Sequence, residues 1–256
     1  SLDRILRNLR AECGSETEIV LFSDHGMNLE ENRRVNLQTH LKQSGYEVVS
    51  HMRRERGKRR VSAPGFGLCG YAALYCGEET DRAELSGALL SLEGVDFSLH
   101  REDGTGAVVV TGRRGRARIL RREQKGATRY RYEMLDGDPL LLSSIADALK
   151  VEGRLDADGF APDAAWLART AEHTYPDALS NLYESLNAPL VRHTADVLVS
   201  LEDGHYYGST AFSRIARLMA THGNALRPSS TAFLMSTHRA FPPHVRAVEA
   251  KPFLRE

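Results

Sequence analysis

The stretch EIVLFSDHG, residues 18–26, joins an apolar run to a polar turn and sets the expected fold. Glu18 to Phe22 has the short apolar pattern of a strand buried on both faces. Leu2 to Glu12 carries apolar residues at helical spacing, and Glu30 to Ser44 reads as a second helix. Tyr46 to Ser50 is the next expected strand. This alternation of helix and strand is typical of an α/β fold with a mostly parallel sheet flanked by helices.

The pattern changes between residues 51 and 190. Short strands with glycine-containing links over Val95 to Leu135 predict an antiparallel meander. The α/β pattern then returns with DVLVSL, Asp196 to Leu201, which is typical of a buried strand. We therefore expect two core segments, residues 1–50 and 191–256, interrupted by an α+β insertion over residues 51–190.

The composition is that of an ordinary globular chain and excludes global disorder. Its 256 residues are 41% hydrophobic, and 34 basic residues balance 34 acidic ones. Zero net charge argues against bulk binding to nucleic acid. No apolar run approaches the ~20 residues that cross a bilayer, and the charged, helix-like start shows no signal peptide. We expect a soluble chain and leave its compartment open.

Asp24, His25 and Gly26 directly follow the first apolar run. In open α/β sheets, functional groups gather beyond the carboxyl ends of strands. Neighbouring side chains of a strand point to opposite faces, so Asp24 and His25 can share one ion only where the strand has turned, and Gly26 permits that turn. A carboxylate and an imidazole suit Zn²⁺ or Mn²⁺. The alternative is an ordinary loop in which Asp24 caps a helix.

A second histidine–glycine pair occurs in THGNALRPSSTAFLMSTHR, residues 221–239. His222 lies in a loop that leads toward an expected strand. Taken alone, such a histidine is more typical of a loop or a core than of a metal site. Only the fold can bring it together with Asp24.

EIVLFSDHGM, DVLVSLEDGHYYGS and THGNALRPSSTAFLMSTHR together resemble the alkaline phosphatase superfamily, especially its type I phosphodiesterase/nucleotide pyrophosphatase branch. The resemblance covers roughly residues 1–50 and 190–240. It implies that Asp24 and His25 bind one divalent metal ion and that His222 binds a second. Zinc is expected, with manganese as the alternative. The implied activity is hydrolysis of a small phosphate ester, in which two ions about 4 Å apart activate the nucleophilic oxygen and stabilise the leaving oxygen.

The family's remaining machinery lies before its SDHG turn: an early Asp ligand, a Thr or Ser nucleophile, and an Asp…His pair. Only Ser1 to Ser23 precede Asp24 here, and they match none of these elements. We therefore assign no catalytic nucleophile. The resemblance implies that this chain is the C-terminal part of a longer enzyme, that the missing N-terminal part completes the site, and that the chain alone has little or no activity.

Two further residues are candidates for substrate binding. Tyr206, in the DGHYYG stretch after the expected strand, is a candidate wall of the substrate pocket. Arg227 is a candidate phosphate contact, because a guanidinium matches such anions bidentately. An aromatic turn and a structural arginine are the alternative interpretations.

Other functions fit the same residues. A sulfatase or phosphomonoesterase of the same superfamily would use the same motifs, since the metal residues do not fix the substrate. A non-catalytic module would instead bind an anionic or nucleic-acid partner through the basic stretches Arg53–Arg60 and Arg113–Arg131, where Arg129 and Arg131 alternate with tyrosines. A half-solvated strand gives the same alternation, and zero net charge favours that interpretation.

Overall fold

The structure is a computed structural model that describes residues 1–50, 59–188, 191–211, 215 and 217–254. It divides into unit 1, Ser1–Gly26 with Thr231–Glu256, and unit 2, Met27–Ser230. Every buried residue in the described part of the chain belongs to unit 2. Among the same residues, no helix is both long and apolar enough to span a bilayer.

Unit 1 contains helix α1 (Leu2–Cys13), strands β1 (Val20–Phe22) and β14 (Leu234–Ser236), and the short 3-10 helices η2 (Ala247–Glu249) and η3 (Lys251–Leu254). The N-terminal helix expected from the spacing of its apolar residues is confirmed. β1 and β14 pair antiparallel, with Leu21 opposite Met235.

The expected burial of β1 on both faces is wrong. Phe22 is 59% exposed, and no residue of the strand is buried. β1 and β14 form a sheet of only two strands. So small a sheet does not bury both faces of its strands by itself. The apolar run therefore indicated a strand correctly but not its surroundings.

Unit 2 is built on a nine-stranded sheet with the order β11-β10-β9-β8-β7-β12-β6-β4-β3, beside a three-stranded sheet β2-β13-β5. The strands are β2 (Arg33–Arg34), β3 (Glu47–Val48), β4 (Arg60–Ser62), β5 (Leu68–Cys69), β6 (Tyr71–Cys76), β7 (Val95–Arg101), β8 (Val108–Gly112), β9 (Gly115–Gln124), β10 (Ala127–Met134), β11 (Ala161–Pro162), β12 (Val197–Leu201) and β13 (His205–Gly208).

The mixed α/β class is confirmed, but the large sheet is mostly antiparallel rather than mostly parallel. Only β3 and β4 run parallel within it. β12 is antiparallel to both of its neighbours, β6 and β7. Its apolar run reflects burial on both faces, because Val197 and Val199 pack into one core cluster while Leu198 packs against the other. An apolar run reports burial, and it does not report the direction of the neighbouring strands.

The predicted meander is confirmed, because β7, β8, β9 and β10 pair in sequence, each antiparallel to the next. The tight link from β8 to β9 requires Gly115, whose φ is +110° and whose missing Cβ would lie 2.5 Å from the carbonyl oxygen of Asp136. Hairpin connections of this length can join only antiparallel neighbours.

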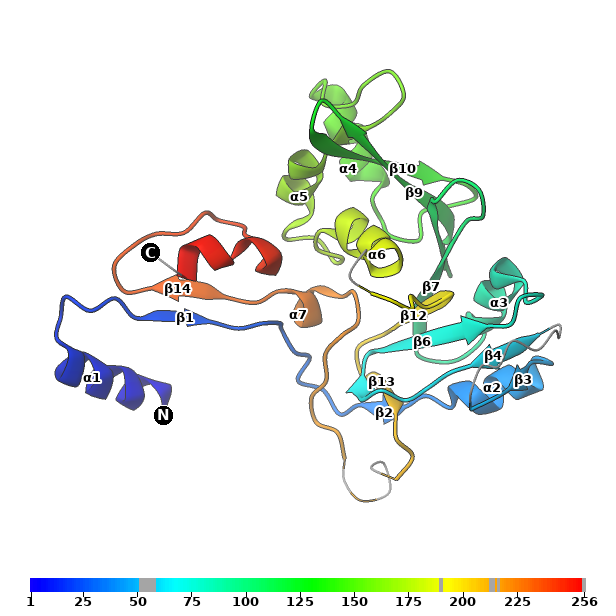
Figure 1. Cartoon of the computed structure of the whole chain (residues 1–256), viewed down its shortest axis with the longest axis horizontal. Coiled ribbons are helices and arrows are strands. Elements are labelled where there is room, and N and C mark those ends of the chain that lie inside the picture. Colours follow the sequence, from blue (N-terminus) through cyan, green and yellow to red (C-terminus); the bar gives the residue numbers. More distant parts are fainter. Residues whose placement is uncertain (51–58, 189–190, 212–214, 216, 255–256) are drawn as a thin grey trace. The chain divides into compact units, whose positions relative to one another are not determined.

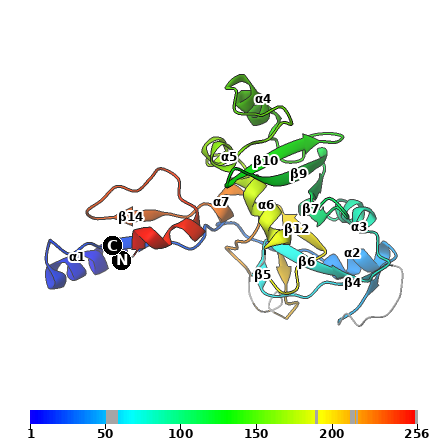
Figure 2. The ribbon, with the colours of Figure 1, turned by 45° about the horizontal axis from the view of Figure 1, so that its top comes forward.

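Helices cover the sheet in two groups (Figure 1). They are α2 (Leu37–Gln43), α3 (Arg82–Leu89), α4 (Ser143–Val151), α5 (Asp163–Thr170) and α6 (Ala178–Asn187). Unit 2 also contains the short helix α7 (Arg227–Ser230). One core cluster packs the meander against α4, α5 and α6, and Figure 2 shows α5 and α6 beside β9 and β10. The other packs β4, β6 and β12 against α2 and α3. The Asp81 carboxylate caps α3 by accepting from the amides of Ala83 and Glu84.

The helix expected over Glu30 to Ser44 is shorter, because the chain first forms β2 and α2 begins only at Leu37. β2 pairs in parallel with β13, so its backbone hydrogen-bonding groups are used by a strand that comes much later in the sequence. This tertiary pairing overrides the helical spacing of the apolar residues.

The domain boundaries expected from the sequence remain a prediction. β12, from the segment expected to return to the core, pairs with β6 and β7 of the expected insertion. Of the basic stretch Arg53–Arg60, all but Arg59 and Arg60 lie outside the described residues.

Asp138 ties the end of the meander to α4. Its carboxylate accepts from the hydroxyl of Tyr132 at 2.7 Å and from the amides of Leu142 at 3.0 Å and Ser143 at 2.8 Å. Burial alone raises the pKa of this carboxyl, but the donors outweigh burial and hold the pKa below its usual value. The carboxylate therefore serves as an acceptor for the first turn of the helix.

We expect Asp138→Ala to lower the free energy of unfolding by about 2–3 kcal/mol, because it leaves the buried Tyr132 hydroxyl and two amides without their acceptor. Urea denaturation at neutral pH measures this loss. Asp147→Ala, an exposed change within α4, is the control and should stay within about 0.5 kcal/mol of the wild type. Equal stabilities of the two variants would contradict the role of Asp138.

Candidate functional site

The polar residues singled out by the sequence gather in unit 2 at the edge of the large sheet where β12 ends. Antiparallel pairing places the starts of β6 and β7 at this same edge. The amide of Leu201 donates to the carbonyl of Gly70 at 2.9 Å, and the amide of Glu202 donates to that of Gly94 at 2.9 Å. The loop that follows β12 is thereby fixed against both neighbouring strands.

The turn that carries His222 lies at this edge. The carbonyl of His222 accepts from the amide of Gly70 at 2.8 Å, and the hydroxyl of Thr221 donates to the carbonyl of Leu68 at 2.6 Å. Gly223 has a φ of +100°, and a Cβ there would lie 3.0 Å from the ring of Tyr71. The glycine of the motif is therefore needed both for the turn and for close approach to an aromatic ring.

A backbone bridge joins this turn to the chain that follows the DHG motif. The amide of Asn28 donates to the carbonyl of Thr221 at 2.9 Å. The amide of Thr221 in turn donates to the side-chain oxygen of Asn28 at 3.2 Å. Both residues are buried. Residues from opposite ends of unit 2 are thus held together directly before His222.

Around this bridge lies an amide–carboxylate group that we call the asparagine cluster: Asn28, Asn32, Asp203 and Asn224. Asp203 Oδ1 accepts from Nδ2 of Asn28 at 3.1 Å and from Nδ2 of Asn224 at 2.9 Å. Asn32 Nδ2 donates to Asn28 Oδ1 at 3.0 Å. The three asparagines are at most 5% exposed. Sequence reasoning missed this cluster, although each of its members except Asn32 lies within or directly beside one of the motifs.

Asp24 and His25 belong to unit 1, where they follow β1. His25 Nδ1 lies 2.7 Å from the carbonyl of Gly26, and a carbonyl can only accept, so Nδ1 donates and, in the neutral ring, Nε2 carries the lone pair. Nε2 is 3.7 Å from Asp24 Oδ1. Two ligands at about 2.0 Å around a tetrahedral ion lie roughly 3.3 Å apart. The expected turn thus leaves these two side chains able to share an ion, with the outer hydrogen bond that metal-binding histidines commonly make.

Within the described residues, no three His, Cys, Asp or Glu side chains meet as a ready metal-binding group. His222 belongs to unit 2, whereas Asp24 and His25 belong to unit 1. The donor types and the His25 orientation fit zinc. The assignment of all three residues as metal ligands remains a prediction.

The two candidate substrate residues have quite different surroundings. Tyr206 is 2% exposed, and its carbonyl accepts from the amide of Val35 at 2.9 Å. Arg227 begins α7, where its guanidinium pairs with the carboxylate of Glu172 and its amide donates to the carbonyl of Thr174 at 2.9 Å. Tyr206 therefore contributes to the interior, and an anion at Arg227 would compete with Glu172. Both substrate assignments remain predictions.

Arg129 and Arg131, the two arginines that alternate with tyrosines, are paired with acidic residues. Arg129 Nε lies 3.2 Å from Asp156, and Arg131 Nη2 lies 3.1 Å from Glu133. The alternating Tyr130 and Tyr132 are buried at 2% and 8% exposure, so they present no ring for stacking on a base. The alternation is that of a strand with one polar and one buried face.

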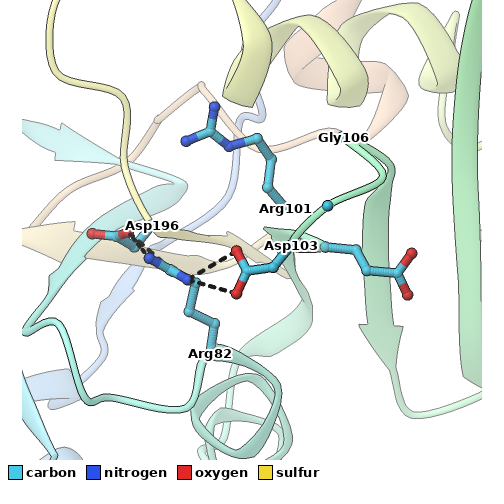
Figure 3. A pocket seen from close by; sticks show the side chains of 7 residues that line it. Arg82, Arg101, Asp103, Gly106 and Asp196 are labelled. Carbon is cyan, nitrogen blue, oxygen red and sulfur yellow. Dashed lines mark hydrogen bonds and ion pairs between the residues drawn. The ribbon is translucent and has the colours of Figure 1, made fainter.

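A cavity of about 230 Å³ lies at the opposite edge of the sheet, where β7 ends and β12 begins (Figure 3). Within it, Arg82 Nε is 3.0 Å from Asp196 Oδ1, and Arg82 Nη1 is 3.4 Å from Asp103 Oδ1. The remaining lining residues are Arg101, Glu102, Gly104 and Gly106. The central guanidinium of Arg82 is shared between the carboxylates of Asp103 and Asp196.

Asp96 lies at the start of β7, beside the end of β12. Like the asparagine cluster, it was not singled out from the sequence. Tyr175 Oη lies 3.0 Å from each of its carboxylate oxygens. The pKa of Asp96 is raised to about 6, chiefly by burial. The charge of Glu202 also raises it, whereas the hydrogen bond from Tyr175 and the charges of Arg114 and Arg113 lower it. The carboxyl therefore gains its proton more readily in the folded chain than in the unfolded one.

Comparison with known proteins leaves the family open, because no protein-family model, no curated protein and no solved structure matches this chain.

The raised pKa of Asp96 predicts a pH dependence of stability. The stabilisation of the fold by protonated Asp96 is fully present below the unfolded pKa of about 3.9, and it is lost as the pH rises through about 6. We expect Asp96→Asn, which keeps an acceptor for Tyr175, to gain roughly 2–3 kcal/mol relative to the wild type between pH 4 and pH 7. Urea denaturation across this range measures the difference, and parallel curves for the two proteins would show that Asp96 does not titrate in this way.

Proposed function

We propose that this chain is part of a metal-dependent phosphoesterase with an alkaline phosphatase-like active site, of the phosphodiesterase/nucleotide pyrophosphatase kind. The observation that carries the proposal is the bridge between Asn28 and Thr221. Only Gly26 and Met27 separate His25 from Asn28, and His222 directly follows Thr221. In the sequence, both predicted metal motifs therefore lie within a few residues of this bridge.

The chemistry of the donors supports the same reading. Asp24 supplies a carboxylate that offsets cation charge, and the neutral ring of His25 places its lone pair on Nε2, because Nδ1 donates to a backbone carbonyl. His222 stands in a turn whose backbone is fixed on both sides. An imidazole must be neutral to bind a metal, so zinc affinity falls in acid. When bound, two such ions would activate a nucleophilic oxygen and stabilise a leaving oxygen.

The nucleophile and the remaining ligands are proposed to come from a preceding part of the same protein. No residue of this chain matches them, and the partners implied are therefore that part and a small phosphate-ester substrate. A nucleic-acid partner is not proposed, because Arg129 and Arg131 are ion-paired and the alternating tyrosines are buried.

Metal binding tests the proposal most directly. In the chain together with any native sequence that precedes it, we expect close to two zinc ions by mass spectrometry, as for a two-metal site. Asp24→Ala and His222→Ala should each weaken zinc binding by at least about tenfold in calorimetry, because each removes a ligand. His193→Ala, at an exposed histidine outside the motifs, is the matched control. Wild-type protein without bound zinc, or variants that bind like the control, would refute the proposal.

Hydrolysis identifies the ester class on the same proteins. A chromogenic phosphodiester should be the best substrate, and its hydrolysis should fall with zinc in both ligand variants. Faster hydrolysis of a phosphomonoester or a sulfate ester would move the protein to those branches of the superfamily, since the metal residues do not fix the leaving group.

A further inference from the structure

We propose that Asp203 is a positioning residue that sets the direction of the His222 turn through Asn28 and Asn224. The inference rests on the proposed function and adds a residue that the metal motifs do not contain. Asp203 Oδ1 is the shared acceptor of two amide groups, at 3.1 Å from Asn28 Nδ2 and 2.9 Å from Asn224 Nδ2. Three segments far apart in the sequence meet at this one oxygen.

The two asparagines pass this constraint on to the backbone of the turn. Asn28 donates to Asp203 and accepts, through its Oδ1, from the amide of Thr221 at 3.2 Å. Asn224 likewise donates to Asp203 and accepts from the amide of Leu226 at 3.3 Å. Each side chain thus holds the carboxylate at one end and the turn at the other, on either side of His222.

Because both asparagines are buried, their side-chain amides depend on protein acceptors. Asn28 and Asn224 are 3% and 5% exposed, so a side-chain amide that loses its acceptor there has little water to replace it. A buried amide without an acceptor is destabilising, because it loses its hydrogen bond to water without gaining another. Asn28 Nδ2 also donates to Asn32 Oδ1 at 3.3 Å, so a change at Asp203 is expected to reorient Asn224 more than Asn28.

The packing beneath the turn limits how else it can settle. The carbonyl of His222 is held by the amide of Gly70, and a Cβ on Gly70 would lie 3.1 Å from both the Cβ and the amide nitrogen of Asn224. At Gly70 the turn therefore lies directly against backbone, and at Gly223 it lies against the ring of Tyr71. Displaced asparagines would shift the His222 backbone, and with it the direction of the imidazole.

Two substitutions separate positioning from charge. Asp203→Asn removes the negative charge but keeps one oxygen that can accept from both amides, whereas Asp203→Ala removes the acceptor. Asp138→Ala is the matched control, because it also removes a part-buried carboxylate with several donors, but far from the motifs in the sequence. Zinc affinity by calorimetry and stability by urea denaturation are measured on all three variants and on the wild type.

We expect zinc affinity to fall about tenfold in Asp203→Ala, the size of effect typical of groups that orient metal ligands, and to stay within about threefold of wild type in Asp203→Asn and Asp138→Ala. Equal affinities of Asp203→Ala and wild type would overturn the inference and leave the proposed function intact. Equal losses in both Asp203 variants would show that charge acts instead of positioning. Equal losses of zinc affinity in Asp203→Ala and Asp138→Ala would show that general destabilisation causes the loss, and would overturn the inference.

A wild type that binds no zinc overturns the proposed function and this inference together. If Asp203→Ala does not fold, Asn224→Ala replaces it, because it removes one of the two donors and leaves the carboxylate held by Asn28. The same tenfold loss of zinc affinity is then expected, and an unchanged affinity counts against the inference.

Discussion

The antiparallel pairing of β12 between β6 and β7 is the constraint on which the arrangement of unit 2 depends. It places Val197 and Val199 in one core cluster while Leu198 packs against the other, so the strand is covered on both faces. The same pairing carries Asp203 to the edge where β6 and β7 begin. Without this register, the loop after β12 would not meet the turn that holds His222.

At that edge, buried polar groups take over from apolar packing. One carboxylate oxygen of Asp203 receives two amide donors, and the amides in turn accept from the backbone. Fully paired polar groups of this kind fix one arrangement, because each alternative leaves a buried donor or acceptor unsatisfied. The hydrogen bonds of the asparagine cluster therefore fix the conformation of these loops, which contain mainly small and polar residues.

The charged residues of the meander serve the fold in a different way. Arg122 and Arg129 converge on Asp156, whose side chain also accepts from the amide of Phe160 at 3.0 Å. Pairs of this exposure contribute little stability individually. Their main effect is that acidic side chains neutralise the positive charge of these arginines. A sequence that looks like a nucleic-acid surface therefore folds into an ordinary half-solvated sheet, which is why we base the functional proposal on the metal motifs.

Local sequence determined the elements whose signals are local. Helical spacing located α1, and the glycine-containing links located the meander, because a helix face and a hairpin turn each depend on residues close together in the chain. The mostly antiparallel direction of the sheet, the division into two units, and the meeting of Asn28, Asp203 and Asn224 were decided only by the tertiary structure. An apolar run indicates burial but does not identify the partner strand. Hydrogen bonds between residues 21 and 175 positions apart leave no periodic pattern in the sequence.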